Sequence, residues 1–450
     1  MQKILILILV LFTFHVSHGQ ARKIEFVEYD LDNGLHVILH QDNTTPIVAV
    51  TVLYHVGSKN EDPNRTGFAH FFEHLLFEGS ENIGRGEIDK YIRNAGGVLN
   101  AYTMQDRTFY HEVLPSNQLA LGLWIESERM LHAKIDSIGV ETQREVVKEE
   151  KRQRIDNQPY MSFQYELFRR AFKVHPYRWI TIGSLDHLNE ATLDEFIDFY
   201  KTFYVPQNAT LSIAGDINID ETKKLIDLYF KDIPRGSREI PRPTVVEPPQ
   251  QQEIRDVIYD NIQLPAVFQG YHIPADGTEE AYAVDMLNRL LSGGQSSRMY
   301  KALVDEQKKA LAVQAFPYPL TDPGLYIVLA LPNVGVDINE LEKAMDAEIE
   351  KVKTDLISES EFQKIRNQVE SQFVQQNSSM AGIAEQLAIY HTHFGDANLI
   401  NTEIERYMKV TREDIRRVAQ KYLTKENRVV LHYLPKSAQN NPASTQSEKE

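Results

Sequence analysis

The chain has 450 residues, of which 42% are hydrophobic and 10% are aromatic, as is usual for a soluble globular protein with a large core. A chain of this length holds two or three domains if each takes roughly 100–200 residues. The absence of cysteine excludes a disulfide-rich scaffold. The net charge of −16 argues against binding to nucleic acid or to an anionic membrane surface, because either would require a basic patch.

Residues 1–19 predict a signal peptide. Lys3 precedes a strongly apolar run from Ile4 to Phe14, and the small residues Ser17 and Gly19 suit cleavage just after them. The run is too short to cross a bilayer as a helix, which takes about 20 apolar residues. An uncleaved N-terminal anchor is the alternative. We therefore expect an exported protein, most simply a periplasmic one.

Hydrophobic periodicity predicts strands and helices in both halves of the chain. Alternating or continuous apolar runs predict strands at 35–40, 47–56, 108–115, 209–215 and 325–331. Apolar residues at helical spacing predict helices at 66–78, 86–95, 117–132, 137–155, 192–203, 279–291 and 358–376. Because strands and helices do not alternate strictly, we expect an α+β fold rather than a doubly wound parallel sheet.

Two segments, one near the end of each half, share a pattern of residues. Thr192 and Thr411 are each followed three residues later by an acid, Glu195 or Asp414, which is typical of a helix N-terminus. In both segments an asparagine follows the threonine by sixteen residues, and a β-rich run ends the unit. The shared offsets favour an internal duplication over a chance similarity of two helix–turn–strand units.

The composition of the connecting segments completes the division of the chain. A proline-rich stretch without helical periodicity is typical of an extended linker, and the polar C-terminal segment is typical of disorder. We expect a signal peptide (1–19), an N-terminal domain (20–235), a linker (236–252), a related C-terminal domain (253–435) and a disordered tail (436–450).

One motif in the N-terminal half indicates a specific chemistry. Residues 70–74 read His-Phe-Phe-Glu-His, and on a helix His70 and His74 lie on one face with Glu73 beside them. Two neutral imidazoles on one face can bind zinc, and an adjacent carboxylate can take a proton from zinc-bound water. The order His-x-x-Glu-His is the inverzincin signature. A surface helix with coincidental histidines is the alternative.

A catalytic zinc ion usually has a third protein ligand and keeps its fourth position for water. The acidic helical run 141–159 contains Glu145, Glu149 and Glu150. The residues alone do not decide between Glu149 and Glu150. An ordinary solvated helix face explains the run equally well.

Four segments together resemble a known family: GFAHFFEHLLFEGS (67–80), GGVLNAYTMQDRTFYHEVLP (96–115), REVVKEEKRQRIDNQP (144–159) and FYVPQNATLSIAGD (203–216). The chain resembles the pitrilysin/insulinase family of zinc peptidases, specifically the mid-sized branch that includes the mitochondrial processing peptidase subunits. The resemblance covers about residues 20–435. It implies two homologous halves, each with a mostly antiparallel sheet flanked by helices.

The resemblance also implies roles for individual residues. His70 and His74 would be ligands of one zinc ion, and Glu73 would be the general base. The third ligand would be Glu150, with Glu149 as the alternative. Zinc would polarise the scissile carbonyl and lower the pKa of its water towards about 7, while Glu73 accepts the proton and passes it to the leaving amine.

Peptide recognition in this family is similar to strand addition, and the matching segment here is Val98–Tyr102. The resemblance implies that Asn100 and Ala101 meet the substrate backbone, although Asn100 is also explained as an ordinary turn or strand-end amide. Other histidines have no comparable arrangement and are expected to be ordinary polar or partly buried side chains: His111, His132, His175, His391 and His393.

The sequence departs from the family pattern in two places. Gln143 stands where the family usually has a second glutamate near the metal, so we expect a weaker or differently tuned site. Active members hold substrate with an arginine and a tyrosine, seven residues apart, from the C-terminal half. Asp305 and Ala312 occupy those positions here, and a one-residue shift gives Glu306 and Val313. None of these four side chains can replace the pair.

These observations lead to hypotheses about function and assembly. We expect a zinc-dependent endopeptidase that hydrolyses oligopeptides or unfolded segments inside a chamber. It would be the metal-bearing half of a heterodimer in which a related subunit supplies the missing Arg/Tyr pair, although a homodimer is also possible. The alternative is a catalytically impaired structural or assembly subunit of the same family. A zinc-dependent binding protein without turnover is a more remote reading.

Overall fold

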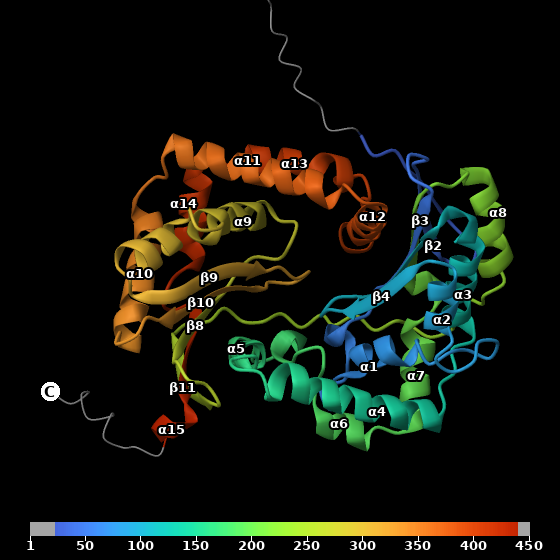
Figure 1. Ribbon diagram of the computed structural model, residues 1–450, viewed down its shortest axis with the longest axis horizontal. Helices are drawn as coiled ribbons and strands as arrows, with labels where there is room; N and C mark the ends of the chain where they lie inside the picture. Colours follow the sequence, from blue (N-terminus) through green and yellow to red (C-terminus); the bar gives the residue numbers. More distant parts are fainter. Residues whose placement is uncertain (1–22, 440–450) are drawn as a thin grey trace, which may run out of the picture.

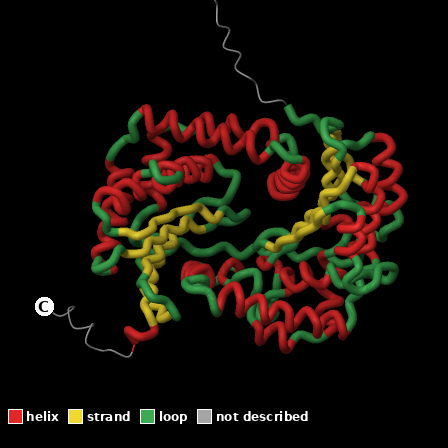
Figure 2. The backbone as a smooth tube through the Cα atoms, in the orientation of Figure 1, coloured by secondary structure: helices red, strands yellow, loops and turns green. Residues whose placement is uncertain are grey.

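A computed structural model describes residues 23–439, so the predicted signal peptide and most of the predicted tail lie outside the described residues. The chain forms two halves, and each contains one β-sheet flanked by helices (Figure 1). Figure 2 shows the strands of the two sheets on opposite sides of the molecule. The expected α+β fold with two mostly antiparallel sheets is confirmed.

The first sheet consists of β1 (Val27–Asp30), β2 (His36–Gln41), β3 (Ile47–Tyr54), β4 (Val98–Thr103), β5 (Thr108–Pro115) and β6 (Ala209–Gly215). The second sheet consists of β7 (Ile254–Asp260), β8 (Ala266–His272), β9 (Ala310–Tyr318), β10 (Leu325–Pro332) and β11 (Arg428–Pro435). The helices of the first half are α1 (Phe68–Leu75), α2 (Ile88–Asn94), α3 (Leu119–Leu131), α4 (Ser137–Lys151), α5 (Phe163–Ala171), α6 (Leu185–Glu190), α7 (Leu193–Phe203) and α8 (Ile219–Phe230). Those of the second half are α9 (Glu279–Ser292), α10 (Ile338–Thr354), α11 (Glu359–Gln376), α12 (Met380–Phe394), α13 (Leu399–Lys409), α14 (Arg412–Tyr422) and α15 (Lys436–Gln439).

The two sheets repeat one topology. Their strand orders are β1-β2-β6-β3-β5-β4 and β7-β11-β8-β10-β9. If β1 is left out and the strands of each sheet are numbered along the chain, both sheets have the spatial order 1-5-2-4-3. Each sheet contains one parallel pair, β2 with β6 or β7 with β11, among antiparallel neighbours. The helices with threonine N-caps, α7 and α14, are each followed by an asparagine and then by the last strand of that sheet. The asparagine side chain donates to a backbone carbonyl five residues earlier, Asn208 to Phe203 and Asn427 to Tyr422. This repetition supports the internal duplication.

The two halves exchange a helix. In the first sheet, α12 from the second half packs on the face that contains Ile38, Ala49 and Ala214. In the second sheet, α5 from the first half packs on Phe268 and Leu431. The opposite faces are covered by helices of the same half. The sequence does not reveal this exchange, because the apolar face of a helix does not identify the sheet it will cover.

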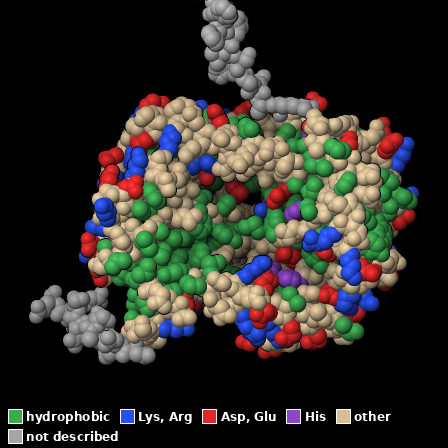
Figure 3. Space-filling model, viewed as in Figure 1, with side chains coloured by type: hydrophobic (Ala, Val, Ile, Leu, Met, Phe, Trp, Pro, Cys, Tyr) green, Lys and Arg blue, Asp and Glu red, His purple; other side chains and the backbone are tan. Residues whose placement is uncertain are grey.

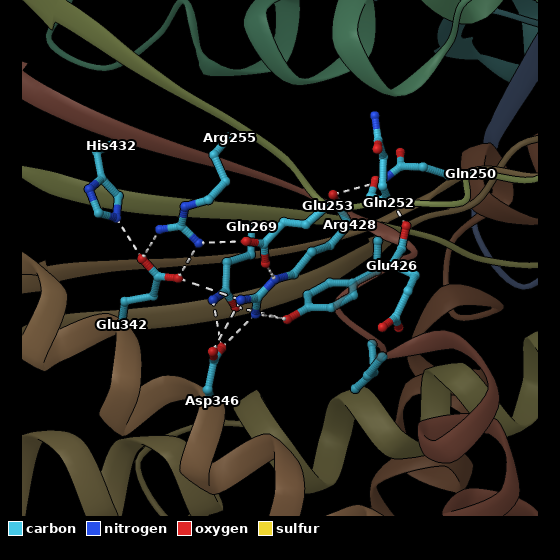
Figure 4. A network of polar contacts seen from close by, with 12 residues as sticks. Gln250, Gln252, Glu253, Arg255, Gln269, Glu342, Asp346, Glu426, Arg428 and His432 are labelled. Atoms are coloured by element: carbon cyan, nitrogen blue, oxygen red, sulfur yellow. Dashed lines mark hydrogen bonds and ion pairs between the residues drawn. The ribbon is translucent and has the colours of Figure 1, made fainter.

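A polar network fixes one edge of the second sheet to α10 (Figure 4). Glu342 of α10 accepts hydrogen bonds from Arg255 of β7 at 2.8 and 2.6 Å and lies 2.6 Å from the imidazole of His432 on β11. Asp346, one turn later, accepts from Arg428 at 2.6 Å and from Gln269 at 2.9 Å. These bonds satisfy charges that would be costly to bury alone.

The expected linker and the start of the tail lie outside the two sheets. No helix or strand lies between α8 and β7, where the linker was expected. Its Glu247 carboxylate accepts three backbone N–H groups, from residues 173–175, at 2.9 to 3.0 Å. The tail does not begin as unstructured chain, because Lys436–Gln439 form α15 next to β7 and β11. Among the described helices, none is long and apolar enough to span a membrane.

Candidate metal centre

The His-Phe-Phe-Glu-His motif lies on α1, as expected from its spacing. Phe68, Phe71 and Phe72 are buried in the first core, and the rings of Phe68 and Phe71 stack on Phe196 of α7 at centroid distances of 4.6 Å. This aromatic face determines how α1 is rotated. His70 and His74, which are four positions apart, therefore lie on or beside the opposite face.

The N-terminus of α1 is held by a buried carboxylate. Gly67 has a positive φ of 99°, a conformation that glycine adopts without strain, and it brings the chain into the first turn. The backbone N–H groups of Gly67 and Ala69 both donate to the Glu61 carboxylate at 2.9 Å. Burial raises the pKa of Glu61 to about 8, and the backbone N–H groups at this helix N-terminus oppose the rise.

The structure brings His70, His74 and Glu150 together. The Glu150 Oε2 atom lies 3.5 Å from His70 Nε2 and 3.1 Å from His74 Nε2. One ligand atom from each of the three residues lies within 4.8 Å of the other two. Two imidazole nitrogens and one carboxylate oxygen are a donor set that fits Zn²⁺ with a position left for water.

Glu149 does not share this position. Its side chain is 52% exposed and bonds to Arg152 at 3.1 Å and to Gln153 at 2.7 Å, whereas that of Glu150 is 14% exposed. Consecutive residues of a helix point about 100° apart, so only one of the two can face α1. Of the two glutamates between which the sequence did not decide, Glu150 is the one that faces His70 and His74.

The protonation states suit a cation. Burial, together with the neighbouring His74, lowers the pKa of His70 to about 4, so this imidazole is neutral at pH 7. Burial opposes ionisation of Glu150, but the hydrogen bond from His74 and the nearby imidazoles outweigh it and hold the Glu150 pKa below its usual value. Neutral imidazoles and an ionised carboxylate are the forms that bind metal.

Glu73 lies beside this group and has a different environment. Burial raises its pKa above the usual value, and a 2.7 Å hydrogen bond from the Thr103 hydroxyl opposes the rise. Glu73, Asn100 and Ala101 line one cavity of about 810 Å³ with His74 and Glu150. Asn100 and Ala101 belong to β4, which ends the first sheet and, among the described strands, pairs with β5 alone.

Figure 3 shows a hollow between the two halves on the face that it presents. Hydrophobic side chains gather on the side of the second half, and acidic and histidine side chains lie on the other side of the opening.

Two residues of the site were missed in the sequence. Thr103 lies on β4 and bonds to Glu73, and Arg154 pairs with the second oxygen of Glu150 at 2.6 Å. The spacing of four between Glu150 and Arg154 is a weak signal, since such pairs are common on helices. Arg154 stands in a π-helical turn, Arg152–Asp156, that continues α4.

The structure also places the other side chains that the sequence singled out. The Gln143 amide donates to Glu78 at 2.5 Å, and Glu78 also pairs with Arg85. His132 lies 3.2 Å from Glu128, and His175 lies 3.3 Å from Asp322. His391 was expected to have no metal-like neighbours, but this expectation is wrong, because its ring stacks on His36 beside Glu28.

Comparisons with known proteins identify the family. The family profile described as "Insulinase (Peptidase family M16)" matches residues 36–184, and "Peptidase M16 inactive domain" matches residues 190–369. A relative named zinc protease PqqE, from Helicobacter pylori, is 33% identical over 412 residues, which cover 90% of this chain and 92% of the relative. The chain belongs to the M16 peptidase family. The resemblance noted in the sequence is confirmed.

Solved structures support the M16 fold. A protease from Helicobacter pylori matches with a TM-score of 0.87 and 29% identity, over 92% of this chain and 100% of the solved chain. The first half of the periplasmic protease PqqL from Escherichia coli matches with a TM-score of 0.74 over 92% of this chain and 93% of that one. At its 19% identity, the second likeness supports the fold alone.

Zinc titration of variants distinguishes the two neighbouring glutamates. We expect Glu150→Gln to weaken zinc binding by about 100-fold or more, because it removes a charged ligand oxygen, a larger loss than that of a supporting contact. Glu149→Gln is the matched control and should bind zinc as the parent does. Competition with a fluorescent chelator measures both constants. Equal affinities for the two variants would contradict the position given to Glu150.

Proposed function

We propose that this M16 family member is a zinc-dependent endopeptidase. His70, His74 and Glu150 bind one zinc ion, and Glu73 is the general base. The observation that carries the proposal is the meeting of two imidazoles from one helix with a carboxylate from a remote helix, within 4.8 Å. The relatives named zinc proteases support the same conclusion.

The chemistry divides between the ion and the side chains. A zinc ion at these ligands would act as a Lewis acid on the scissile carbonyl and would lower the pKa of a water molecule towards about 7. Glu73 takes the proton of the attacking water on its carboxylate and then passes it to the nitrogen of the leaving amine. A raised pKa favours both steps, since the carboxylate is a stronger base and its acid form persists long enough to donate.

The substrate backbone adds to the free edge of β4. Asn100 and Ala101 stand on this strand and line the cavity that contains Glu73 and His74. An extended peptide that pairs with β4 would carry its scissile bond past these side chains. This geometry favours unfolded segments and oligopeptides over folded proteins, since most strands of a folded substrate are already paired and fixed in their own sheet.

A related partner subunit completes the site. Asp305 lies in a π-helical segment, Tyr300–Glu306, and Ala312 lies on the edge strand β9, so the expected Arg/Tyr positions carry an acid and a methyl group. The chain covers 93% of the first half of PqqL but only 48% of the whole PqqL chain. A second unit of similar size is therefore a natural source of the missing pair, as a heterodimer or, less simply, a homodimer.

A catalytically impaired structural or assembly subunit of the family is the second candidate. Asp305 and Ala312 favour it because they cannot hold substrate. The complete set His70, Glu73, His74 and Glu150 favours the peptidase. We further propose an exported, periplasmic location, on the basis of the apolar N-terminal segment.

Glu73→Gln should separate zinc binding from turnover. We expect peptide cleavage to fall by about 100-fold or more, because the general base is lost, while zinc content stays at one ion per chain. Glu145→Gln changes another glutamate of the same cavity and should leave the rate unchanged. A fluorogenic peptide assay and elemental analysis measure both quantities. Undiminished cleavage by Glu73→Gln would exclude it as the base.

The Thr103 hydroxyl should set the acid limb of the pH–rate profile. Glu73 acts as a base only when ionised, so cleavage is lost as the pH falls through its pKa. Thr103→Val removes the bond that lowers this pKa, so the acid limb of kcat/KM should move to higher pH. Thr103→Ser keeps a hydroxyl and should keep the parent profile. An acid limb that stays in place in Thr103→Val would show that the bond does not tune Glu73.

The partner proposal predicts a gain of function in the isolated chain. The purified chain should cleave peptides slowly, and the double variant Asp305→Arg/Ala312→Tyr should raise kcat/KM by supplying the missing groups. The shifted pair Glu306→Arg/Val313→Tyr is the matched control and should not. Native mass spectrometry gives the assembly for each preparation. Full activity of the unmodified chain as a homodimer would rule out the need for a different partner.

A further inference from the structure

A second group of potential metal ligands lies away from α1. Glu28 stands on β1, His36 on β2 and His391 in the last turn of α12. One ligand atom from each lies within 4.8 Å of the other two, and His36 Nε2 is 3.4 Å from the Glu28 carboxylate. Val37 and Leu39 face the core that contains α1, whereas Ile38 faces α12. By strand alternation His36 shares the α12 face, so this group and α1 lie on opposite faces of the first sheet.

A fourth side chain prepares His36 as a ligand. Asp30 lies opposite His36 in the β1–β2 ladder and its Oδ1 atom is 2.8 Å from His36 Nδ1. An Nδ1–H that donates to Asp30 leaves the lone pair on Nε2, facing Glu28. A carboxylate that orients the far nitrogen of an imidazole is the usual support of a metal-bound histidine.

The His36 Nε2 atom is not otherwise used. It is buried and makes no hydrogen bond among the described residues, which is unusual for a polar atom. Glu28 is 44% exposed on its side chain, so an ion could reach the group from solvent. We therefore interpret the Nε2 atom as an available metal ligand, and not as part of an ordinary core histidine whose hydrogen bonds are all formed.

We propose that Glu28, His36 and His391 form a second site for a divalent transition-metal ion such as zinc. Two imidazoles and a carboxylate are the same donor set as in the first site, which suits zinc and related borderline cations rather than calcium or magnesium. The ion would fasten β1 and β2 to α12. It would be structural, since no residue with a free acid or base function lies in the group.

The ring geometry limits the affinity of the second site. The imidazoles of His36 and His391 lie nearly parallel, with an interplanar angle of 3° and centroids 3.4 Å apart. A cation binds in the plane of an imidazole, so one ring must turn about its Cβ–Cγ bond to reach a shared ion. The directly stacked arrangement is not the one that aromatic rings prefer, so little stabilisation is lost when the ring turns. We expect weaker binding here than at His70, His74 and Glu150.

The experiment counts zinc in a full-length chain that lacks the first site. The double variant His74→Gln/Glu150→Gln, dialysed against micromolar zinc, should retain one ion per chain by elemental analysis. Adding His391→Phe keeps an aromatic ring over His36 and removes the ligand nitrogens, so the ratio should fall towards zero. His132→Phe is the matched control for replacing a partly exposed histidine, and its ratio should stay at one.

A second readout does not depend on the His391 variant. Zinc should raise the melting temperature of the double variant, because it binds only the folded chain. Adding Glu28→Gln, on an exposed side chain, should reduce that rise and weaken binding by about 10-fold or more. No zinc in the double variant, or a ratio unchanged by His391→Phe and Glu28→Gln, would overturn the proposal. Neither result bears on the first site.

Discussion

The contact between Glu150 and the two histidines of α1 is the interaction on which the site depends. His74 and Glu150 are 76 positions apart in the chain, so the contact depends on the packing of α4 against α1. Stacked phenylalanine rings fix the rotation of α1, and Glu61 holds its first turn. The packing of α1 and α4 therefore holds the three side chains close together, and a site on well-supported elements is more precise than one on loops.

The sequence predicted the local features of this arrangement better than the distant ones. The spacing of His70, Glu73 and His74 indicated one helix face, because helical periodicity is a local property. The choice between Glu149 and Glu150 depended on how α4 crosses α1, and only the folded chain contains that information. Thr103 was missed for the same reason, since its role arises from the closeness of β4 to α1.

The division into two halves was also only partly readable. Repeated capping residues and asparagines indicated a duplication, and the two sheets do share one strand order. The places of α5 and α12 could not be inferred, because their apolar faces fit either sheet. The surroundings of His391 could not be predicted for this reason, because its neighbours on β1 and β2 belong to the other half and lie more than 350 residues away in sequence.

The exchange of α5 and α12 makes the two halves interdependent. A fragment that ended at the linker would expose Ile38, Ala49 and Ala214 to water, and the remaining fragment would expose Phe268 and Leu431. Each piece would then carry a bare apolar sheet surface, which favours aggregation. Although the chain looks like two copies of one unit, we expect it to unfold as a single cooperative body.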